Sequence, residues 1–199
     1  MTDTEQNTDT VSVGITVTEA PPPPPTVSYA LDTARSSLHF VSTKKTHVVE
    51  THTFTELSGG ISPEGEAVLR INLNSVDTGV SIRNQRMRDY LFETASFGEA
   101  EVTLGVDMDT LATLSIGETL EQAVTPIVNL HGVSLAVATT VTITRLSADA
   151  ILVQNTQPIL LNATDFGLTD GIETLRSLAS LSVISHVVPI NITLIFNTP

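Results

Sequence analysis

The sequence contains no cysteine and no tryptophan, and its 199 residues include only six Phe and two Tyr. Without cysteine there can be no disulfide, no thiolate zinc site and no cysteine nucleophile. With so few aromatic rings, most of the apolar volume has to come from Val, Leu and Ile. The β-branched Val and Ile, together with frequent Thr, favour the pleated surface of a β-sheet.

Positive charge is scarce as well, because nine Lys and Arg face 22 Asp and Glu, and the formal net charge is -13. This balance argues against nucleic acid as a partner, since binding a phosphate backbone takes many Lys and Arg. It disfavours general adhesion to anionic lipid for the same reason. One local cluster of bases could still bind a single polar head group.

The chain has no run of about 18 apolar residues, so the sequence predicts no transmembrane segment. Residues 2–10, TDTEQNTDT, have neither the basic start nor the apolar centre of a signal peptide. If the protein is exported, its targeting segment therefore lies outside this sequence.

Motifs that carry catalysis are also missing: the sequence has no GxSxG, no P-loop and no HExxH. His47 and His52 lie five positions apart, so on one regular strand they would face opposite sides. The other three histidines are isolated in the sequence. We therefore expect no catalytic residue, no metal site and no required cofactor, and the protein is predicted not to be an enzyme.

Residues 1–28 differ from the rest of the chain, because they contain four acids and no base and run into Pro21–Pro25. Consecutive prolines favour a polyproline II rod without backbone donors. We predict that residues 1–28 form a disordered acidic, Pro-rich tail or linker and that residues 29–199 form one domain. A strand over Val11–Val17 and a Pro-rich docking ligand are the alternatives.

Within the predicted domain the hydrophobic period is mostly two, which is typical of β-strands with one apolar face. Near-strict alternation predicts one long strand over residues 133–144. Further strands are expected over residues 37–43, 47–57, 67–73, 102–108, 150–155, 157–163 and 190–196. Helical spacing over residues 82–92 and 170–181 predicts two short helices. The fold class is therefore all-β: a single eight-stranded antiparallel barrel, closed because exposed edges invite aggregation.

Short motifs in a fixed order add a resemblance that covers residues 29–197. They read Tyr29-x-Leu31-Asp32, Ser37-x-His39-Phe40, Lys44-Lys45-x-His47-Val48, His52-x-Phe54, Leu57-x-Gly59, Ser75-Val76-x-Thr78-Gly79, Arg83-Asn84-x-Arg86-Met87-Arg88-x-x-Leu91-Phe92-Glu93-Thr94, Leu130-His131-Gly132 and Ala163-x-Asp165-Phe166-Gly167-Leu168. Together they resemble the YceI-like family of lipocalin-like barrels. The stretch after Gly132 departs from the family, because Val133-Ser134 replaces the Thr-Lys-Pro that often follows.

The resemblance implies a periplasmic or secreted bacterial protein whose barrel encloses a long apolar tunnel. The tunnel would hold a polyprenyl or quinone lipid for binding, storage or transport. The alternative is a non-catalytic interaction or adaptor module that its Pro-rich tail tethers to a partner. A homodimer is left open as a further alternative.

Candidate site residues follow from this interpretation. The tunnel lining is expected to include Phe40, Phe54, Leu69, Ile71, Met87, Leu91, Phe92, Phe97, Leu104, Leu135, Val137 and Phe166. A polar head group would meet Arg83, Arg86 and His131, because a guanidinium forms forked hydrogen bonds with phosphate oxygens.

Structural roles compete with each of these assignments. The two arginines could instead pair with Asp77, Asp89, Glu93 or Glu99 and fasten the helix to the barrel. His131 could satisfy a turn, and any one Phe could simply fill the core. Arg88 is expected to be exposed or paired with an acid.

Overall fold

The protein is described by a computed structural model over residues 28–199. The tail predicted for residues 1–28 lies outside the described residues, except for Ser28. Fourteen strands are present in the described part: β1 Tyr29–Leu31, β2 Ser37–Lys44, β3 Val48–Phe54, β4 Leu57–Ile61, β5 Glu66–Asn72, β6 Val76–Asp77, β7 Glu99–Gly105, β8 Thr119–Val124, β9 Ile127–Leu130, β10 Val133–Ala136, β11 Thr139–Ser147, β12 Ala150–Asn155, β13 Ile159–Asn162 and β14 Val187–Asn197.

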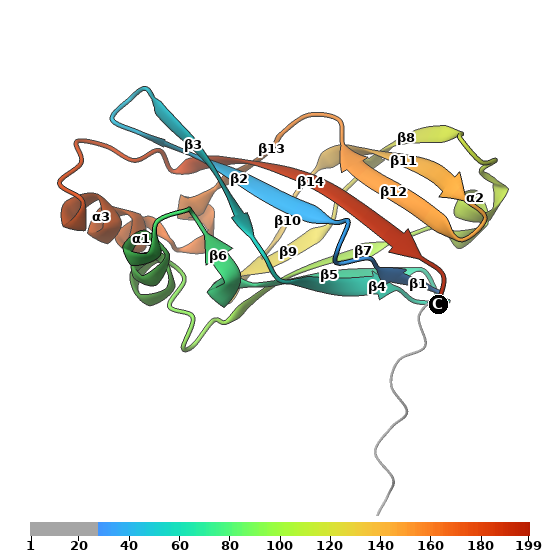
Figure 1. Ribbon diagram of the computed structural model, residues 1–199, viewed down its shortest axis with the longest axis horizontal. Helices are drawn as coiled ribbons and strands as arrows, with labels where there is room; N and C mark the ends of the chain where they lie inside the picture. Colours follow the sequence, from blue (N-terminus) through green and yellow to red (C-terminus); the bar gives the residue numbers. More distant parts are fainter. Residues whose placement is uncertain (1–27) are drawn as a thin grey trace, which may run out of the picture.

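Helical segments are few and short. They are α1 Ser81–Arg86, the π-helical turn η2 Met87–Leu91, α2 Met108–Thr113, α3 Thr169–Leu178, and the 3₁₀ turns η1 Leu73–Ser75 and η3 Ala163–Phe166. The α-helices lie at the two ends of the long axis of the molecule, with α1 and α3 at one end and α2 at the other (Figure 1). We call these the α1–α3 end and the α2 end. None of the helices in residues 28–199 is long and apolar enough to cross a membrane.

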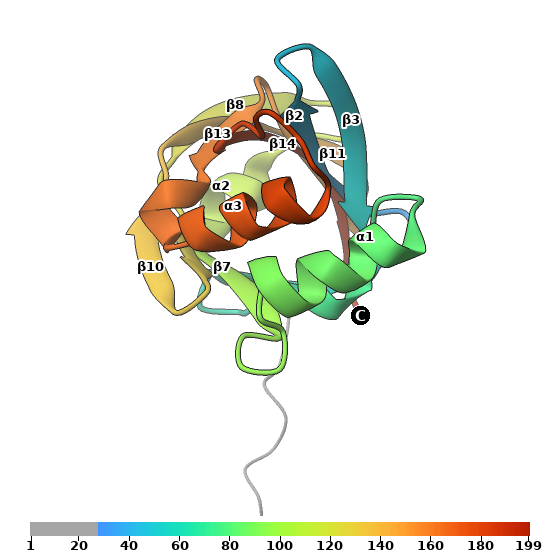
Figure 2. The same cartoon turned by 90° about the vertical axis from the view of Figure 1, so that its left-hand side faces the viewer.

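All fourteen strands belong to one antiparallel sheet, so the prediction of a mainly β fold is confirmed. Ten of the strands run in the order β10-β9-β7-β5-β4-β1-β14-β12-β11-β8. The other four lie off this path: β13 and β2 pair with β14, β3 pairs with β2, and β6 pairs with β3. β14 is its central element, since successive parts of this strand pair with β13, β2, β12 and β1. Viewed along the long axis, the strands wrap around the molecule, and α1 and α3 lie across one end (Figure 2).

The prediction of a closed, eight-stranded barrel was wrong. The sheet has 14 strands, and its two terminal strands, β10 and β8, are not paired with each other. Residues 119–147 form one long hairpin. Its half nearer the turn, β9 and β10, joins one side of the sheet, and its other half, β8 and β11, joins the other side. β9 pairs with β7, whereas β8 has β11 as its single partner among the strands of residues 28–199. The two sides of the sheet are therefore joined by the covalent chain of this hairpin. They are not joined by a ladder between β7 and β8.

The single strand predicted over residues 133–144 is interrupted, because β10 ends at Ala136 and β11 begins at Thr139. The pairing register is nevertheless unbroken, since Ala136 pairs with Ile127 and Thr139 pairs with Val124. Pro126 lies opposite the interruption and has no N–H to donate to the ladder. Its carbonyl still accepts a hydrogen bond from the backbone N–H of Val137 at 2.9 Å.

Both predicted helical regions are helical, with boundaries that differ slightly from the prediction. Residues 82–92 contain most of α1 and all of η2, and residues 170–181 contain most of α3. The two regions pack closely, because a Cβ on Gly171 of α3 would lie 2.6 Å from the backbone oxygen of Tyr90. Glycine at this position therefore allows α3 to approach η2 directly.

Helix α2 was not predicted, since the alternation of Val102, Leu104, Val106 and Met108 indicates a strand that continues to residue 108. The structure ends β7 at Gly105. The Asp107 side chain then accepts hydrogen bonds from the backbone N–H groups of Asp109 and Thr110 and caps the new helix. The capping residue was visible in the sequence, but the hydrophobic alternation was the stronger pattern.

Candidate ligand cavity

A cavity of about 650 Å³ occupies the inside of the sheet. Apolar side chains from most strands and from all three α-helices line it. Ile82 of α1 and Leu111 of α2 both belong to the lining, although these helices lie at opposite ends of the molecule (Figure 1). The cavity therefore runs along the long axis and is suited to an extended ligand.

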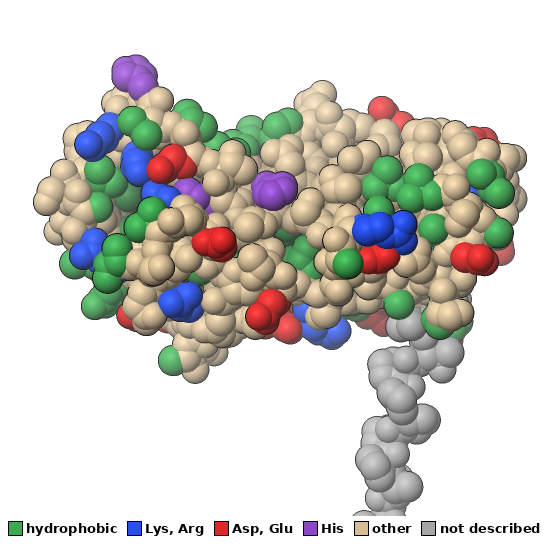
Figure 3. All heavy atoms as spheres, in the orientation of Figure 1, with side chains coloured by type: hydrophobic (Ala, Val, Ile, Leu, Met, Phe, Trp, Pro, Cys, Tyr) green, Lys and Arg blue, Asp and Glu red, His purple; other side chains and the backbone are tan. Residues whose placement is uncertain are grey.

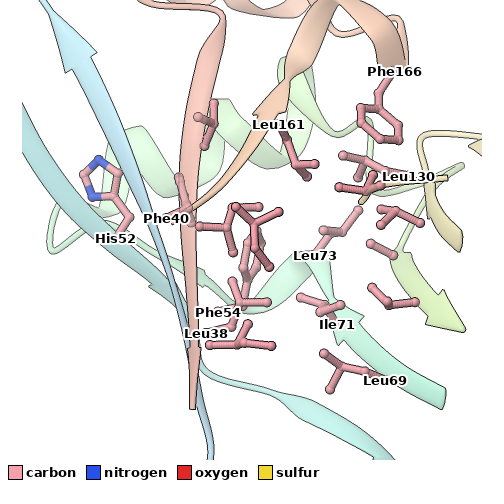
Figure 4. Close-up of a pocket in the computed structure, with 18 of the residues that line it drawn as sticks. Leu38, Phe40, His52, Phe54, Leu69, Ile71, Leu73, Leu130, Leu161 and Phe166 are labelled. Atoms are coloured by element: carbon pink, nitrogen blue, oxygen red, sulfur yellow. The ribbon is translucent and has the colours of Figure 1, made fainter. Parts of the chain in front are cut away.

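Aromatic rings form a continuous row along one wall of the cavity. The ring centroids of Phe40 and Phe54 are 5.3 Å apart, and those of Phe54 and Phe92 are 5.7 Å apart. Leu69 and Ile71 of β5 point into the same space (Figure 4). These inward positions follow from the alternation of the strands, because Arg70 lies between Leu69 and Ile71 and forms an ion pair with Glu101 outside.

The structure brings most of the expected tunnel residues together. The lining contains Phe40, Phe54, Leu69, Ile71, Met87, Leu91, Phe92, Leu104, Val137 and Phe166. It also contains Arg83 and Arg86, at the α1–α3 end.

Phe97, Leu135 and His131 lie outside the lining. Leu135 packs on a small separate cluster of Ala163, Phe166, Leu168 and Ile172. His131 has a φ of 54° and Gly132 a φ of 76°, so the pair forms the two-residue turn between β9 and β10. The His131 ring contacts Phe97, with centroids 4.3 Å apart, and its Nε2 lies 2.9 Å from Glu93 Oε2. This places His131 in the structural role that competed with the head-group role.

A polar cluster occupies the α1–α3 end of the otherwise apolar cavity. Its members are Ser42, Lys44, Glu50, His52 and Arg83, all in the lining. Glu50 Oε2 accepts hydrogen bonds from Lys44 Nζ at 2.5 Å and from Arg83 Nη1 at 2.8 Å. Arg83 Nη2 donates to the carbonyl of Thr78 at 2.7 Å. Arg83 therefore does fasten α1 to the sheet, but through Glu50 and not through any of the four acids predicted as partners.

Two further arginines follow Arg83 in the sequence, Arg86 and Arg88, and neither forms an ion pair within residues 28–199. Arg86 Nη1 donates to the carbonyl of Leu178 at 3.3 Å, which joins α1 to α3. Arg88 Nη2 donates to Gln85 Oε1 at 2.7 Å. Arg86 thus combines a contact to the cavity with an unneutralised charge.

Two buried polar atoms of the polar cluster have no hydrogen-bond partner in the described part of the chain, His52 Nδ1 and Arg83 Nε. Leaving such atoms unsatisfied is costly, typically about 1–3 kcal/mol each. His52 is only 5% exposed, and its Nε2 lies 2.9 Å from Ser42 Oγ. A ligand that supplies polar atoms at this end would satisfy groups that the protein leaves unpaired.

The charges of this cluster follow from the environment of each group. The hydrogen bond from Lys44 lowers the pKa of Glu50, and the charge of Arg83 adds to this effect against the opposing effect of burial. Burial lowers the pKa of His52, and the positive charge of Arg83 lowers it further. At neutral pH the cluster therefore contains two cations, one carboxylate and a neutral imidazole.

Four site residues were not predicted, although the period of two along these strands indicates them: Ser42, Lys44, Glu50 and His52. Phe40, Ser42 and Lys44 share one face of β2, and Glu50, His52 and Phe54 share one face of β3. The register pairs Phe40 with His52 and Ser42 with Glu50. The polar residues therefore continue the inward face that the two phenylalanines begin.

The depressed pKa of His52 predicts a pH-dependent stability. Below the usual histidine pKa of about 6.5, residue 52 binds a proton in the unfolded chain but not in the folded chain. The free energy of unfolding therefore falls as the pH falls. The parent should lose free energy of unfolding between pH 7 and pH 5, and His52→Gln should lose less over the same range. Gln can keep the hydrogen bond to Ser42 but does not titrate.

Urea denaturation at pH 5, 6 and 7 measures this effect. His47→Gln, on the exposed turn between β2 and β3, is the matched control and should show the parent's pH dependence. The same slope in His52→Gln as in the parent would contradict a neutral, buried His52.

Residues 28–199 contain no group of three His, Asp or Glu side chains close enough to hold a metal ion. An antiparallel sheet wrapped around one long apolar cavity is the architecture of proteins that enclose a slim apolar ligand. The fold and the cavity thus define a barrel-like binding protein.

The family model described as "YceI-like domain" matches residues 29–196, and the chain belongs to the YceI-like family. The resemblance seen in the sequence motifs is thereby confirmed. A search of curated proteins gives no match.

Two solved structures illustrate the similarity. A polyisoprenoid-binding domain from Saccharophagus degradans, implicated in plant cell wall breakdown, is 52% identical, with a TM-score of 0.86. The match covers 87% of this chain and 100% of that domain. BcnA from Burkholderia cenocepacia is 18% identical, with a TM-score of 0.65, and the match covers 83% of this chain and 98% of BcnA. The second similarity supports the fold alone.

Proposed function

We propose that this protein binds a long isoprenoid lipid, a polyprenyl or quinone species, inside the cavity. The observation that carries the proposal is the length of the apolar lining, which reaches from Ile82 of α1 to Leu111 of α2. The description of the 52% identical relative as a polyisoprenoid-binding domain supports the same ligand class. The role is binding, storage or transport and not catalysis.

Apolar burial supplies the affinity in this proposal. Each buried CH₂ group contributes about 0.8 kcal/mol, so a chain of several isoprene units needs few polar contacts. The cavity wall consists largely of Val, Leu, Ile and Phe side chains, which offer no hydrogen bonds that would select a polar ligand. Selectivity for one lipid chain over another would rest on the length and width of the cavity.

The polar head of the lipid is proposed to lie at the α1–α3 end. Arg83 and Arg86 line the cavity there, and Arg83 Nε is a buried donor without a partner. His52 Nδ1 is the second unsatisfied atom, so His52 takes the place that the sequence analysis gave to His131. An oxygen of a quinone or of a phosphate can accept from Arg83 Nε.

Organic extraction of the freshly purified protein, followed by mass spectrometry, tests the proposal. A polyprenyl or quinone species should be released in an amount comparable to that of the protein. An extract without lipid, or one containing only fatty acids or phospholipid, would contradict it.

The adaptor alternative depends on residues 1–28, and it stays a prediction because this tail lies almost wholly outside the described residues. Deleting residues 1–28 should leave the extracted lipid unchanged, whatever the tail does. We also propose a periplasmic or secreted location, in keeping with the family to which the chain belongs.

A further inference from the structure

Six apolar side chains stand exposed at the α1–α3 end. We call them the apolar rim: Val48 and Val49 at the start of β3, Val80 and Ile82 at the start of α1, Leu178 at the end of α3, and Val183 in the segment that follows. Each is at least 40% exposed, and Val49 and Ile82 reach 61% and 59%. Exposed apolar residues gathered in this way mark interaction sites more often than isolated ones do.

Polar contacts between the three segments hold the parts of the apolar rim next to one another. The backbone N–H of Lys45 donates to the carbonyl of Val183 at 3.0 Å, and Arg86 reaches the carbonyl of Leu178. The ion pair of Arg83 with Glu50 joins α1 to β3. Figure 2 shows α1, α3 and the β2–β3 hairpin around the same end of the molecule.

The cavity opens within this rim. Val80, Ile82 and Ala179 line the cavity and are also exposed to solvent. Gly105 and Gln122 are exposed lining residues too, at the unpaired flank between β7 and β8. The apolar rim surrounds only the first opening.

Positive charge is concentrated at the same end. Residues 41–50, 76–91 and 169–186 contain six of the nine Lys and Arg but only five of the 22 Asp and Glu, a net formal charge of +1. Most of the blue side chains, with green ones among them, accordingly lie toward the left-hand end of the space-filling view (Figure 3). The rest of the chain carries the acidic excess.

We propose that the apolar rim and its surrounding cations dock on a membrane that carries anionic lipid head groups. This inference rests on the proposed function, because a lipid ligand has to enter from, or leave to, a lipid surface. Exposed valines and Ile82 can enter the interfacial layer, and each Lys or Arg near an anionic surface adds to the attraction. The acidic remainder of the molecule is repelled by the same surface, which orients the opening toward the bilayer.

Co-sedimentation with vesicles tests this surface. The parent should bind vesicles of equal parts phosphatidylglycerol and phosphatidylcholine, and binding should weaken as salt is raised. The double variant Val49→Asp/Val183→Asp should bind at least tenfold less. Neither residue lines the cavity, so the lipid recovered by extraction should not change.

The matched control places the same two charges at the α2 end. Ile116 and Leu146 are 68% and 40% exposed there, and Ile116→Asp/Leu146→Asp should bind the vesicles as the parent does. An equal loss in both double variants would overturn the proposal, because net charge alone would then explain it. So would parent binding to pure phosphatidylcholine that matches its binding to the mixed vesicles.

A second copy of the chain is the competing occupant of the rim. A dimer in sedimentation analysis that Val49→Asp/Val183→Asp dissociates, without vesicle binding by the parent, would overturn the membrane proposal. The extraction experiment separates this failure from a failure of the proposed function. A lipid-filled protein that ignores vesicles refutes only the docking surface, whereas an empty protein that binds them refutes only the isoprenoid ligand.

Discussion

Val128→Trp is expected to reduce the lipid recovered with the purified protein at least tenfold. Val128 lies in β9 opposite Val102 of β7, and both side chains line the cavity. An indole ring at this position would occupy part of the about 650 Å³ that the ligand needs. Losing the burial of one isoprene unit, about five carbons, would cost about 4 kcal/mol. That corresponds to roughly a thousandfold in affinity.

The added ring has room, because it enters an existing cavity and not a filled core. The variant should therefore fold, with the far-ultraviolet circular dichroism of the parent. Ile127→Trp is the matched control: Ile127 is the preceding residue of β9, is 44% exposed and is not in the lining. It should keep its lipid. Equal lipid in both variants would show that the ligand lies elsewhere.

Phe166→Ala is expected to lower the free energy of unfolding by about 3–5 kcal/mol, the usual cost of removing a buried Phe. Phe166 is 2% exposed and lies in η3, where it packs with Ala163, Leu168 and Ile172. This cluster joins β13 to α3, so its loss should also loosen the α1–α3 end. Urea denaturation of protein stripped of lipid measures the effect without a contribution from ligand contacts.

Phe97→Ala provides the comparison for this experiment. Phe97 is only half-buried and packs against the tilted ring of His131 outside the cavity. Its removal should cost about 1 kcal/mol, in the ordinary range for a point substitution. If Phe166→Ala cost no more than this, Phe166 would be a loosely held lining residue and not a packing element.

Structural features that depend on near neighbours in the sequence could be predicted from the sequence alone. Alternation along β5 and β14 indicated which residues face inward, because successive side chains of a strand point to opposite sides. The helical regions near residues 82–92 and 170–181 were visible from spacing alone. Where the prediction failed locally, as at α2, a capping residue competed with an alternating pattern.

The candidate site was predicted only in part, because its polar end depends on pairing between segments. Glu50 and Arg83 are 33 positions apart, and no local pattern indicates that they meet. His131 was assigned to the head group from its place in a motif, but its turn directs it to Glu93 and Phe97. The composition indicated an acidic chain as a whole, and only the fold shows that six of its nine bases gather at one end.

The sequence by itself therefore determined the family, the mainly β fold and most of the apolar residues that face the interior. These properties follow from local periodicity and from motifs read in order. The tertiary structure decided that the sheet stays unclosed, that one long cavity connects α1 to α2, and that Glu50 and His52 join Arg83 at its end. Those features depend on strand register and on which segments meet in space, and no single stretch of the chain contains that information.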